Sequence, residues 1–396
     1  MKKIVLSMLL LFGAVSFQDV TANATEGADV IIQTESVSGE VDQFAKNDFG
    51  LALTSILFLE GNNISASDYS LGSAFSMFDG EKTETGTVYY PVYLDGKLEF
   101  LYSVRKNELG EYVSSVSRFL VNEVNAAIDS ANGEPISFFV KEDDIFYKIN
   151  DTIEKIFEAP IDEFSNKKSE TTELTIEDAN ETLQSAESNV EEKDISEQTD
   201  FVKQDNISKN SKLSRSSVST AKNYAMINWK INETQGDVPW CAAFVTAAIL
   251  SNKVDARATR AVDIVNYSYP KLTAKQREQN GVSPQQILAY ANYRKTYPKI
   301  VESTVSHSVI ESNLRKGNAL YLGGIGYGSQ TSKSRHAFAL YGWVDNENPS
   351  GGKPYRVYYV WNPWWNYPMT VQGNTLPITI PVPGGGYTWY RTIYNF

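Results

Sequence analysis

Cys241 is the only cysteine among the 396 residues, and its surroundings favour a reactive thiol. Pro239 suits the first turn of a helix, and residues 242–250 are an unbroken run of small and apolar side chains that continues one. Cys241 is therefore predicted in the first turn, where unpaired backbone N–H groups and the helix dipole favour the thiolate. The alternative is a buried cysteine that packs as a small hydrophobic residue.

Three further residues have the side chains that acyl transfer requires. A base for the thiolate has only two candidates, His307 and His336. Gln235 lies six residues before Cys241, so its amide and the backbone N–H of Cys241 can both donate to an oxyanion. Asn362 can accept the N–H of an imidazole and so fix its tautomer and orientation. Taken singly, each of these residue types also has ordinary structural uses.

Two strands must position the histidine and the asparagine. Residues 334–344 are predicted as a strand with His336 at its start, and residues 356–365 as a second strand with Asn362 at its end. Trp364 is expected to lie over the His336–Asn362 bond and keep water out. His307 falls in an amphipathic pattern at 304–314 that leaves it off the packed face, so His336 is the expected base.

Four segments, in this order, resemble the staphopains, which are secreted bacterial cysteine endopeptidases of the papain-like fold made as zymogens. The resemblance covers roughly residues 223–396, and the segments that carry it are 235–250, 336–342, 361–364 and 387–394. It implies a fold with a helical half that carries the cysteine and a β-barrel half that carries the histidine and the asparagine.

The resemblance also implies the role of each site residue. Cys241 would be the nucleophile, His336 the general base and acid, Asn362 the residue that orients the imidazole, and Gln235 the oxyanion donor. The chain lacks the disulfide-forming cysteines of plant and animal papain relatives, and Pro363 stands where those enzymes often carry serine. These differences leave the triad intact and do not allow subsite specificity to be transferred.

The N-terminus is predicted as an export signal. It has a basic start, a short apolar run and small residues around Ala24, so residues 1–24 are expected to be removed. The apolar run is too short to span a membrane, and no second one follows. The expected product is secreted into the extracellular medium of a bacterium.

Residues 25–164 are predicted as a small α+β pro-domain, half-barrel or cystatin-like, although an independent binding module is the alternative. Stretches 76–80, 88–104 and 136–140 alternate like strands, with a hairpin turn at Asp95-Gly96. Residues 110–132 are predicted as a helix, because Val113, Val116 and Val124 share one face.

Residues 165–217 are predicted as an acidic, disordered linker. Its basic end, between Lys209 and Ser217, is the expected processing site, although an uncut tether is the alternative. Residues 218–396 would then be the peptidase domain.

The two ends of the chain carry opposite net charges, and the formal net charge of the whole chain is −12. Residues 1–215 contain 18 Lys and Arg against 39 Asp and Glu, and residues 216–396 contain 18 against 9. An acidic pro-segment would be attracted to a basic enzyme. Scattered basic residues without a binding motif argue against nucleic acid, and two distant histidines with one cysteine argue against a metal site, so no cofactor is expected.

The sequence therefore predicts a secreted cysteine endopeptidase made as a zymogen, with an α+β fold. Expected partners are protein or peptide substrates, the chain's own propeptide as inhibitor and, as an open option, a dedicated protein inhibitor. Two other functions stay open. One is a cell-wall amidase of the CHAP or NlpC/P60 kind, which also uses a helix-borne cysteine and a strand-borne histidine. The other is a non-catalytic binding protein with a relic triad.

Overall fold

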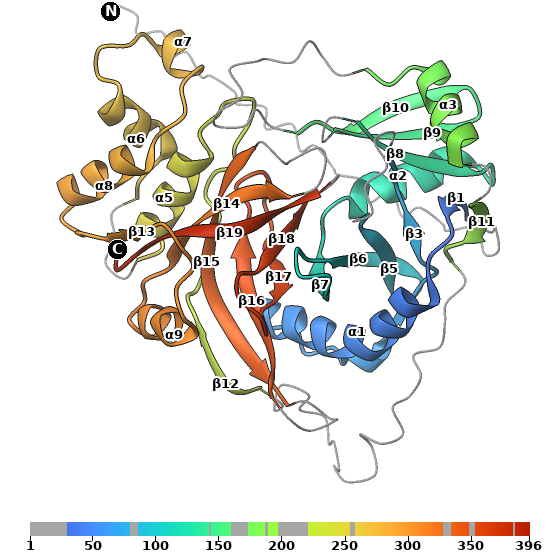
Figure 1. Ribbon diagram of the computed structural model, residues 1–396, viewed down its shortest axis with the longest axis horizontal. Coiled ribbons are helices and arrows are strands. Elements are labelled where there is room, and N and C mark those ends of the chain that lie inside the picture. The colour runs from blue at the N-terminus through green and yellow to red at the C-terminus, as the bar shows by residue number, and fades with distance from the viewer. Residues whose placement is uncertain are drawn as a thin grey trace, which may run out of the picture.

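The structure is a computed structural model that describes residues 30–79, 86–141, 144–159, 173–186, 189–196, 221–253, 258–327, 334–347, 353–382 and 385–396. The predicted export signal and the predicted processing site lie outside these residues. Below, the N-terminal part means the described residues of 30–196, and the C-terminal part those of 221–396. Figure 1 shows the two parts side by side, with the blue and green elements packed against the orange and red strands.

The N-terminal part contains helices α1 (Gly39–Glu60), α2 (Val121–Ala131) and α3 (Ile176–Ala186), and a short 3-10 helix, η1 (Ala66–Asp68). Its strands are β1 (Ile31–Glu35), β2 (Tyr69–Leu71), β3 (Phe75–Ser76), β4 (Phe78–Asp79), β5 (Val88–Leu94), β6 (Lys97–Lys106), β7 (Tyr112–Ser117), β8 (Ile136–Lys141), β9 (Asp144–Ile149), β10 (Thr152–Phe157) and β11 (Val190–Asp194).

The C-terminal part contains helices α5 (Cys241–Ser251), α6 (Ala261–Ser268), α7 (Ala274–Arg277), α8 (Pro284–Tyr293) and α9 (His307–Arg315). Its strands are β12 (Ala221–Met226), β13 (Lys299–Val301), β14 (Leu320–Tyr327), β15 (Arg335–Asn346), β16 (Tyr355–Trp361), β17 (Met369–Gln372), β18 (Thr379–Val382) and β19 (Gly385–Tyr394). The predicted strands that carry His336 and precede Asn362 are confirmed as β15 and β16.

One sheet runs through both parts of the chain. Its order is β13-β19-β14-β15-β16-β17-β7-β6-β5-β2, so β17 of the C-terminal part is hydrogen-bonded to β7 of the N-terminal part. In this antiparallel pair Thr370 lies opposite Val116, and the Thr370 hydroxyl also accepts from the Val116 N–H at 3.2 Å. The two parts therefore share a backbone ladder as well as side-chain contacts.

Helix α1 reinforces this junction. Ser38 caps its start by accepting a hydrogen bond from the Val41 N–H, and Gly61, with φ of 64°, ends it in the left-handed region. On the face toward the C-terminal part, Ser55 accepts hydrogen bonds from the Tyr359 hydroxyl at 3.0 Å and the Asn346 amide at 2.8 Å. The helix thus packs on strands of both parts.

Two predictions for the N-terminal part differ from the structure. The helix expected over residues 110–132 is wrong in its first half, where β7 forms and only α2 is helical. Strand β7 is stabilised on both edges by β6 and β17, and these long-range partners outweigh the helical spacing of the valines. The linker predicted as disordered contains α3 and also β11, which pairs with β1. The hairpin turn at Asp95-Gly96 is confirmed.

The C-terminal part combines helices and strands, so the predicted α+β class is confirmed. Figure 1 shows α5, α6, α7 and α8 gathered on one side of β14, β15 and β19. Helix α5 contacts both β14 and β15. It is apolar all round and almost entirely buried, as expected for a helix enclosed on every side.

Candidate active site

Cys241 is the first residue of α5, so its prediction in the first helical turn is confirmed. The helix begins two residues after Pro239, with Trp240 as the N-cap, so Pro239 lies just outside it. The side chain of the N-cap residue Trp240 makes no capping hydrogen bond, and Cys241 stands at the end of α5 where the helix dipole is positive. Cys241 is 0% exposed.

Gln235 lies in the loop that leads into α5. Its backbone N–H donates to the Pro363 carbonyl at 2.7 Å, which ties this loop to the turn that follows Asn362. Its side-chain amide donates to the Val238 carbonyl at 2.6 Å. The loop before the cysteine and the turn after β16 are therefore neighbours, and the Gln235 amide also serves to fix its own loop.

The side chains of His336 and Asn362 are in direct contact. His336 Nε2 and Asn362 Oδ1 are 2.9 Å apart, and both side chains are buried. The backbone N–H of Trp364 donates to the same oxygen at 3.1 Å, which holds the amide in place. Among the described residues, Nδ1 of His336 has no hydrogen-bond partner.

Burial dominates the protonation of His336. Desolvation lowers the pKa of its imidazole to about 3, although the bond to Asn362 acts in the opposite direction. The ring is therefore neutral at pH 7 in the structure. A neutral ring whose Nε2–H donates to Asn362 has a proton-accepting Nδ1.

Three aromatic rings surround the imidazole. The ring centroid of Trp364 lies 4.4 Å from that of His336, as expected for a side chain that covers the His336–Asn362 bond. Phe338 lies 4.7 Å away in an edge-to-face arrangement, and Tyr387 lies 5.4 Å away. Neither phenylalanine nor tyrosine by itself indicates a contact with histidine, so no role for Phe338 or Tyr387 could be predicted from the sequence.

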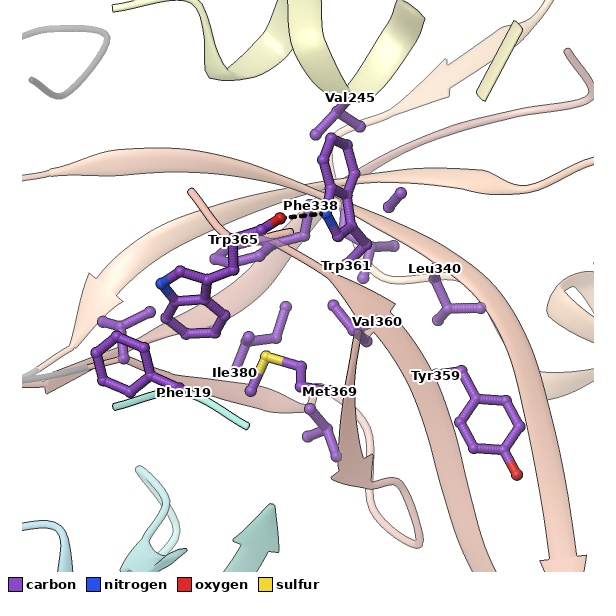
Figure 2. Packing of buried hydrophobic residues seen from close by; sticks show 14 of the residues in the cluster. Phe119, Val245, Phe338, Leu340, Tyr359, Val360, Trp361, Trp365, Met369 and Ile380 are labelled. Carbon is purple, nitrogen blue, oxygen red and sulfur yellow. Dashed lines mark hydrogen bonds between the residues drawn. The ribbon is translucent and has the colours of Figure 1, made fainter. Parts of the chain in front are cut away.

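Side chains of the N-terminal part reach this region. Phe119 stacks on Trp365 with ring centroids 4.5 Å apart, and Phe157 lies 6.3 Å from Trp364. Figure 2 shows Phe119 beside Trp365, whose carbonyl accepts a hydrogen bond from Trp361 at 2.8 Å. Neither contact could be predicted from the sequence, because each joins two residues that lie more than two hundred positions apart.

Helix α5 is packed over the strands that carry His336 and precede Asn362. Figure 2 shows Val245, one turn after Cys241, next to Trp361 at the end of β16. Phe338, two residues after His336, belongs to the same cluster of buried apolar side chains. Helix α5 and strand β15 thus pack against each other.

His307 lies in a different environment from His336. It begins α9, packs edge-to-face on Trp343 at 4.6 Å, and its Nδ1 is 3.2 Å from the Tyr358 hydroxyl. The expectation that His307 points away from the packed face is therefore wrong. Burial, and then the charge of Arg356, lower the pKa of His307.

Within the described ranges there is no cluster of three or more histidine, cysteine, aspartate or glutamate side chains that could bind a metal ion. Among the same residues, no helix combines the length and apolar character needed to cross a membrane.

Residues 220–396 match the family described as staphopain peptidase C47. Staphopain A of Staphylococcus aureus is 22% identical over an alignment of 398 positions, which covers 99% of this chain and 96% of that protein. An extracellular cysteine protease of Staphylococcus epidermidis is 22% identical over an alignment of 384 positions, which covers 93% of this chain and 89% of that protein. The similarity to both relatives therefore extends well beyond the C-terminal part.

Proposed function

We propose that this chain, a cysteine protease whose residues 220–396 belong to the staphopain peptidase family, is exported as a zymogen and cleaves peptide bonds with Cys241, His336 and Asn362. The observation that carries the proposal is the buried His336–Asn362 bond, which leaves Nδ1 of the imidazole as the proton acceptor. The burial of Cys241 and the contacts of Phe157 with Trp364 and of Phe119 with Trp365 support a closed precursor.

In the proposed reaction, His336 Nδ1 takes the thiol proton, and the Cys241 thiolate attacks the carbonyl carbon of the scissile peptide bond. The backbone N–H of Cys241 and the Gln235 amide stabilise the oxyanion. An amide nitrogen carries two hydrogens, so one can hold the Val238 carbonyl while the other faces the oxyanion.

The tetrahedral intermediate then collapses as His336 protonates the leaving amine, which leaves a thioester on Cys241. Water, deprotonated by His336, hydrolyses this thioester and releases the acid product. Asn362 holds the imidazole in one orientation through both steps.

The proposed domain arrangement follows from the described contacts. Residues 1–24 would be the export signal, residues 25–164 the pro-domain, and residues 218–396 the peptidase. Because the N-terminal part adds β7 to the edge strand β17 and places Phe157 against Trp364, it would act as the inhibitor until the connection at 165–217 is cut.

The test uses the full-length chain, cut between Lys209 and Ser217 by added protease, on casein and on peptidoglycan gels. Casein should be cleared only after the cut, and Cys241→Ala should clear none. Clearing of peptidoglycan without casein would instead identify an amidase, and full activity of Cys241→Ala would refute the proposed nucleophile.

A further inference from the structure

A glycine opposite His336 leaves room for two aromatic rings. Gly324 on β14 lies directly opposite His336 on β15. A Cβ atom at Gly324 would lie 2.7 Å from the Tyr387 Cβ and 3.0 Å from a ring carbon of Phe338. Such contacts are too short for packed carbon atoms, so glycine at this position is what lets the two rings approach.

Tyr387 is held against the imidazole from two directions. Its ring packs on Phe338 with centroids 5.5 Å apart, and its hydroxyl accepts a hydrogen bond from Ser334 at 2.9 Å. Ser334 stands two residues before His336, so this bond joins Tyr387 to the backbone that carries the histidine.

The three rings reach the imidazole from three separate segments: Phe338 from β15, Tyr387 from β19, and Trp364 from the turn after β16. Below, these three side chains are called the aromatic enclosure. All three belong to the C-terminal part, and of the three only Trp364 has a ring contact with the N-terminal part among the described residues, through Phe157.

Aromatic rings in this arrangement have two opposite effects on a histidine. By excluding water they disfavour the charged imidazolium, whereas a ring face within about 6 Å of a cation attracts it. The centroids of Trp364 and Tyr387 lie 4.4 and 5.4 Å from the imidazole, which is inside that range.

We propose that Tyr387, together with Phe338, is a positioning residue for the peptidase reaction: it fixes the plane of the His336 ring and stabilises the protonated ring that forms when Cys241 becomes a thiolate. This inference rests on the proposed function, because it assigns a role to groups around the proposed base. The covalent steps are those given above, and Tyr387 exchanges no proton.

The proposal predicts a change in the pH dependence of the reaction. The active form pairs a thiolate with an imidazolium, so kcat/KM rises with thiolate formation on the acid side and falls with imidazolium deprotonation on the alkaline side. Removing a ring that stabilises the imidazolium should raise the apparent pKa of the acid limb and lower the apparent pKa of the alkaline limb, each by about half a pH unit.

The experiment compares pH profiles of kcat/KM on a peptide substrate for enzyme obtained by cutting the full-length chain. Tyr387→Leu should narrow the profile and lower kcat more than it changes KM, and Tyr387→Phe, which keeps the ring, should restore both limbs. Tyr394→Leu is the matched control, because it makes the same exchange on the same strand beside Lys299. Phe338→Leu supplies a second variant, expected to narrow the profile in the same way, should Tyr387→Leu fail to fold.

The proposal is overturned if the pH profile of kcat/KM is unchanged in Tyr387→Leu, or in Phe338→Leu if only that variant folds. It is also overturned if Tyr394→Leu narrows the profile as much as Tyr387→Leu does. Cys241→Ala, assayed in parallel, separates the two levels of the inference. If it is inactive while the limbs do not move, only the role of the enclosure is refuted. If it is active, the proposed function fails and the enclosure proposal fails with it.

Discussion

At the scale of single residues, the site depends on how one asparagine is held. Asn362 Oδ1 lies within hydrogen-bond distance of both the His336 ring and the Trp364 backbone N–H. Two donors on one oxygen fix the amide, and the amide in turn selects the tautomer in which Nε2 carries the proton. A hydrogen bond to a group that becomes charged is worth about 1.5–3 kcal/mol.

Asn362→Ala should therefore lower kcat/KM of the cut enzyme by about 10- to 100-fold, since it removes one such bond. His336→Ala should reduce activity to background, because no other group in the proposed mechanism can move the proton. The measurement is peptide hydrolysis with matched active-site concentrations. Equal losses in both variants would show that Asn362 does more than orient the ring.

The burial of His336 makes the uncut chain sensitive to acid. An unfolded histidine titrates near pH 6.5, whereas burial lowers the pKa of folded His336 to about 3. Between these values the unfolded chain holds a proton that the folded chain lacks, so the free energy of unfolding falls as the pH is lowered. The loss should approach about 1.4 kcal/mol per pH unit below about 6.5.

Urea unfolding of the uncut chain at about pH 7 and about pH 5.5 measures this loss. His336→Gln is the control, because it keeps an amide beside Asn362 and cannot titrate, so it should lose less stability on acidification. The same loss in both proteins would mean that carboxylates alone cause the acid sensitivity.

At the scale of elements, the junction between the two parts is an edge-to-edge strand pair. Strand β17 has β16 on one side and β7 on the other, and Thr370 is buried in the middle of β17. Its hydroxyl lies 3.2 Å from the Val116 N–H and 3.3 Å from the Val116 carbonyl. This residue bonds to the N-terminal part through both its backbone and its side chain.

Thr370→Val keeps the shape of the side chain and removes these hydroxyl bonds. The association of the two parts should weaken by about 1 kcal/mol, so the residual activity of the uncut chain should rise about fivefold. Thr379→Val, the same exchange at a buried position in β18, is the control. If both variants leave equal residual activity, the β7–β17 junction does not keep the precursor closed.

The same elements show what the sequence could predict. The hairpin at Asp95-Gly96 was predictable, because aspartate followed by glycine favours a turn in which both residues have positive φ, as they do here. Strand β7 was not predictable. Its partner strand β17 lies more than two hundred residues further along the chain, and the valines of β7 also fit one face of a helix. The residues of the proposed site were candidates from their type and order, whereas the contacts of the Phe338 and Tyr387 rings with His336 depend on how the strands pair.

At the scale of the whole molecule, the opposite net charges of the two ends of the chain suggest electrostatic attraction between them. The described contacts between the N-terminal and C-terminal parts, however, are not ion pairs. Among the described residues, none of the ion pairs joins the N-terminal part to the C-terminal part. Each of two contacts across the junction instead pairs a charged group with a neutral one: the Arg105 guanidinium donates to the Gly385 carbonyl, and the Thr388 hydroxyl donates to the Glu108 carboxylate at 2.7 Å.

Salt should therefore do little to open the precursor. Between about 0.1 and 1 M salt the screening length falls from about 10 to 3 Å, yet the residual activity of the uncut chain should change by less than about twofold. The cut enzyme, assayed at both salt concentrations, corrects for salt effects on catalysis. A rise of about tenfold in the uncut chain alone would show that charge holds the two parts together.

The most direct test of the central claim uses the single cysteine. The epoxide inhibitor E-64 is added to the uncut and the cut chain, and intact-mass spectrometry is run alongside a peptidase assay. Cutting should allow one adduct to form on Cys241, with activity lost in proportion to labelling, while the uncut chain labels far more slowly. Full activity in completely labelled enzyme, or equal labelling rates before and after the cut, would contradict a peptidase whose Cys241 nucleophile is covered in the precursor.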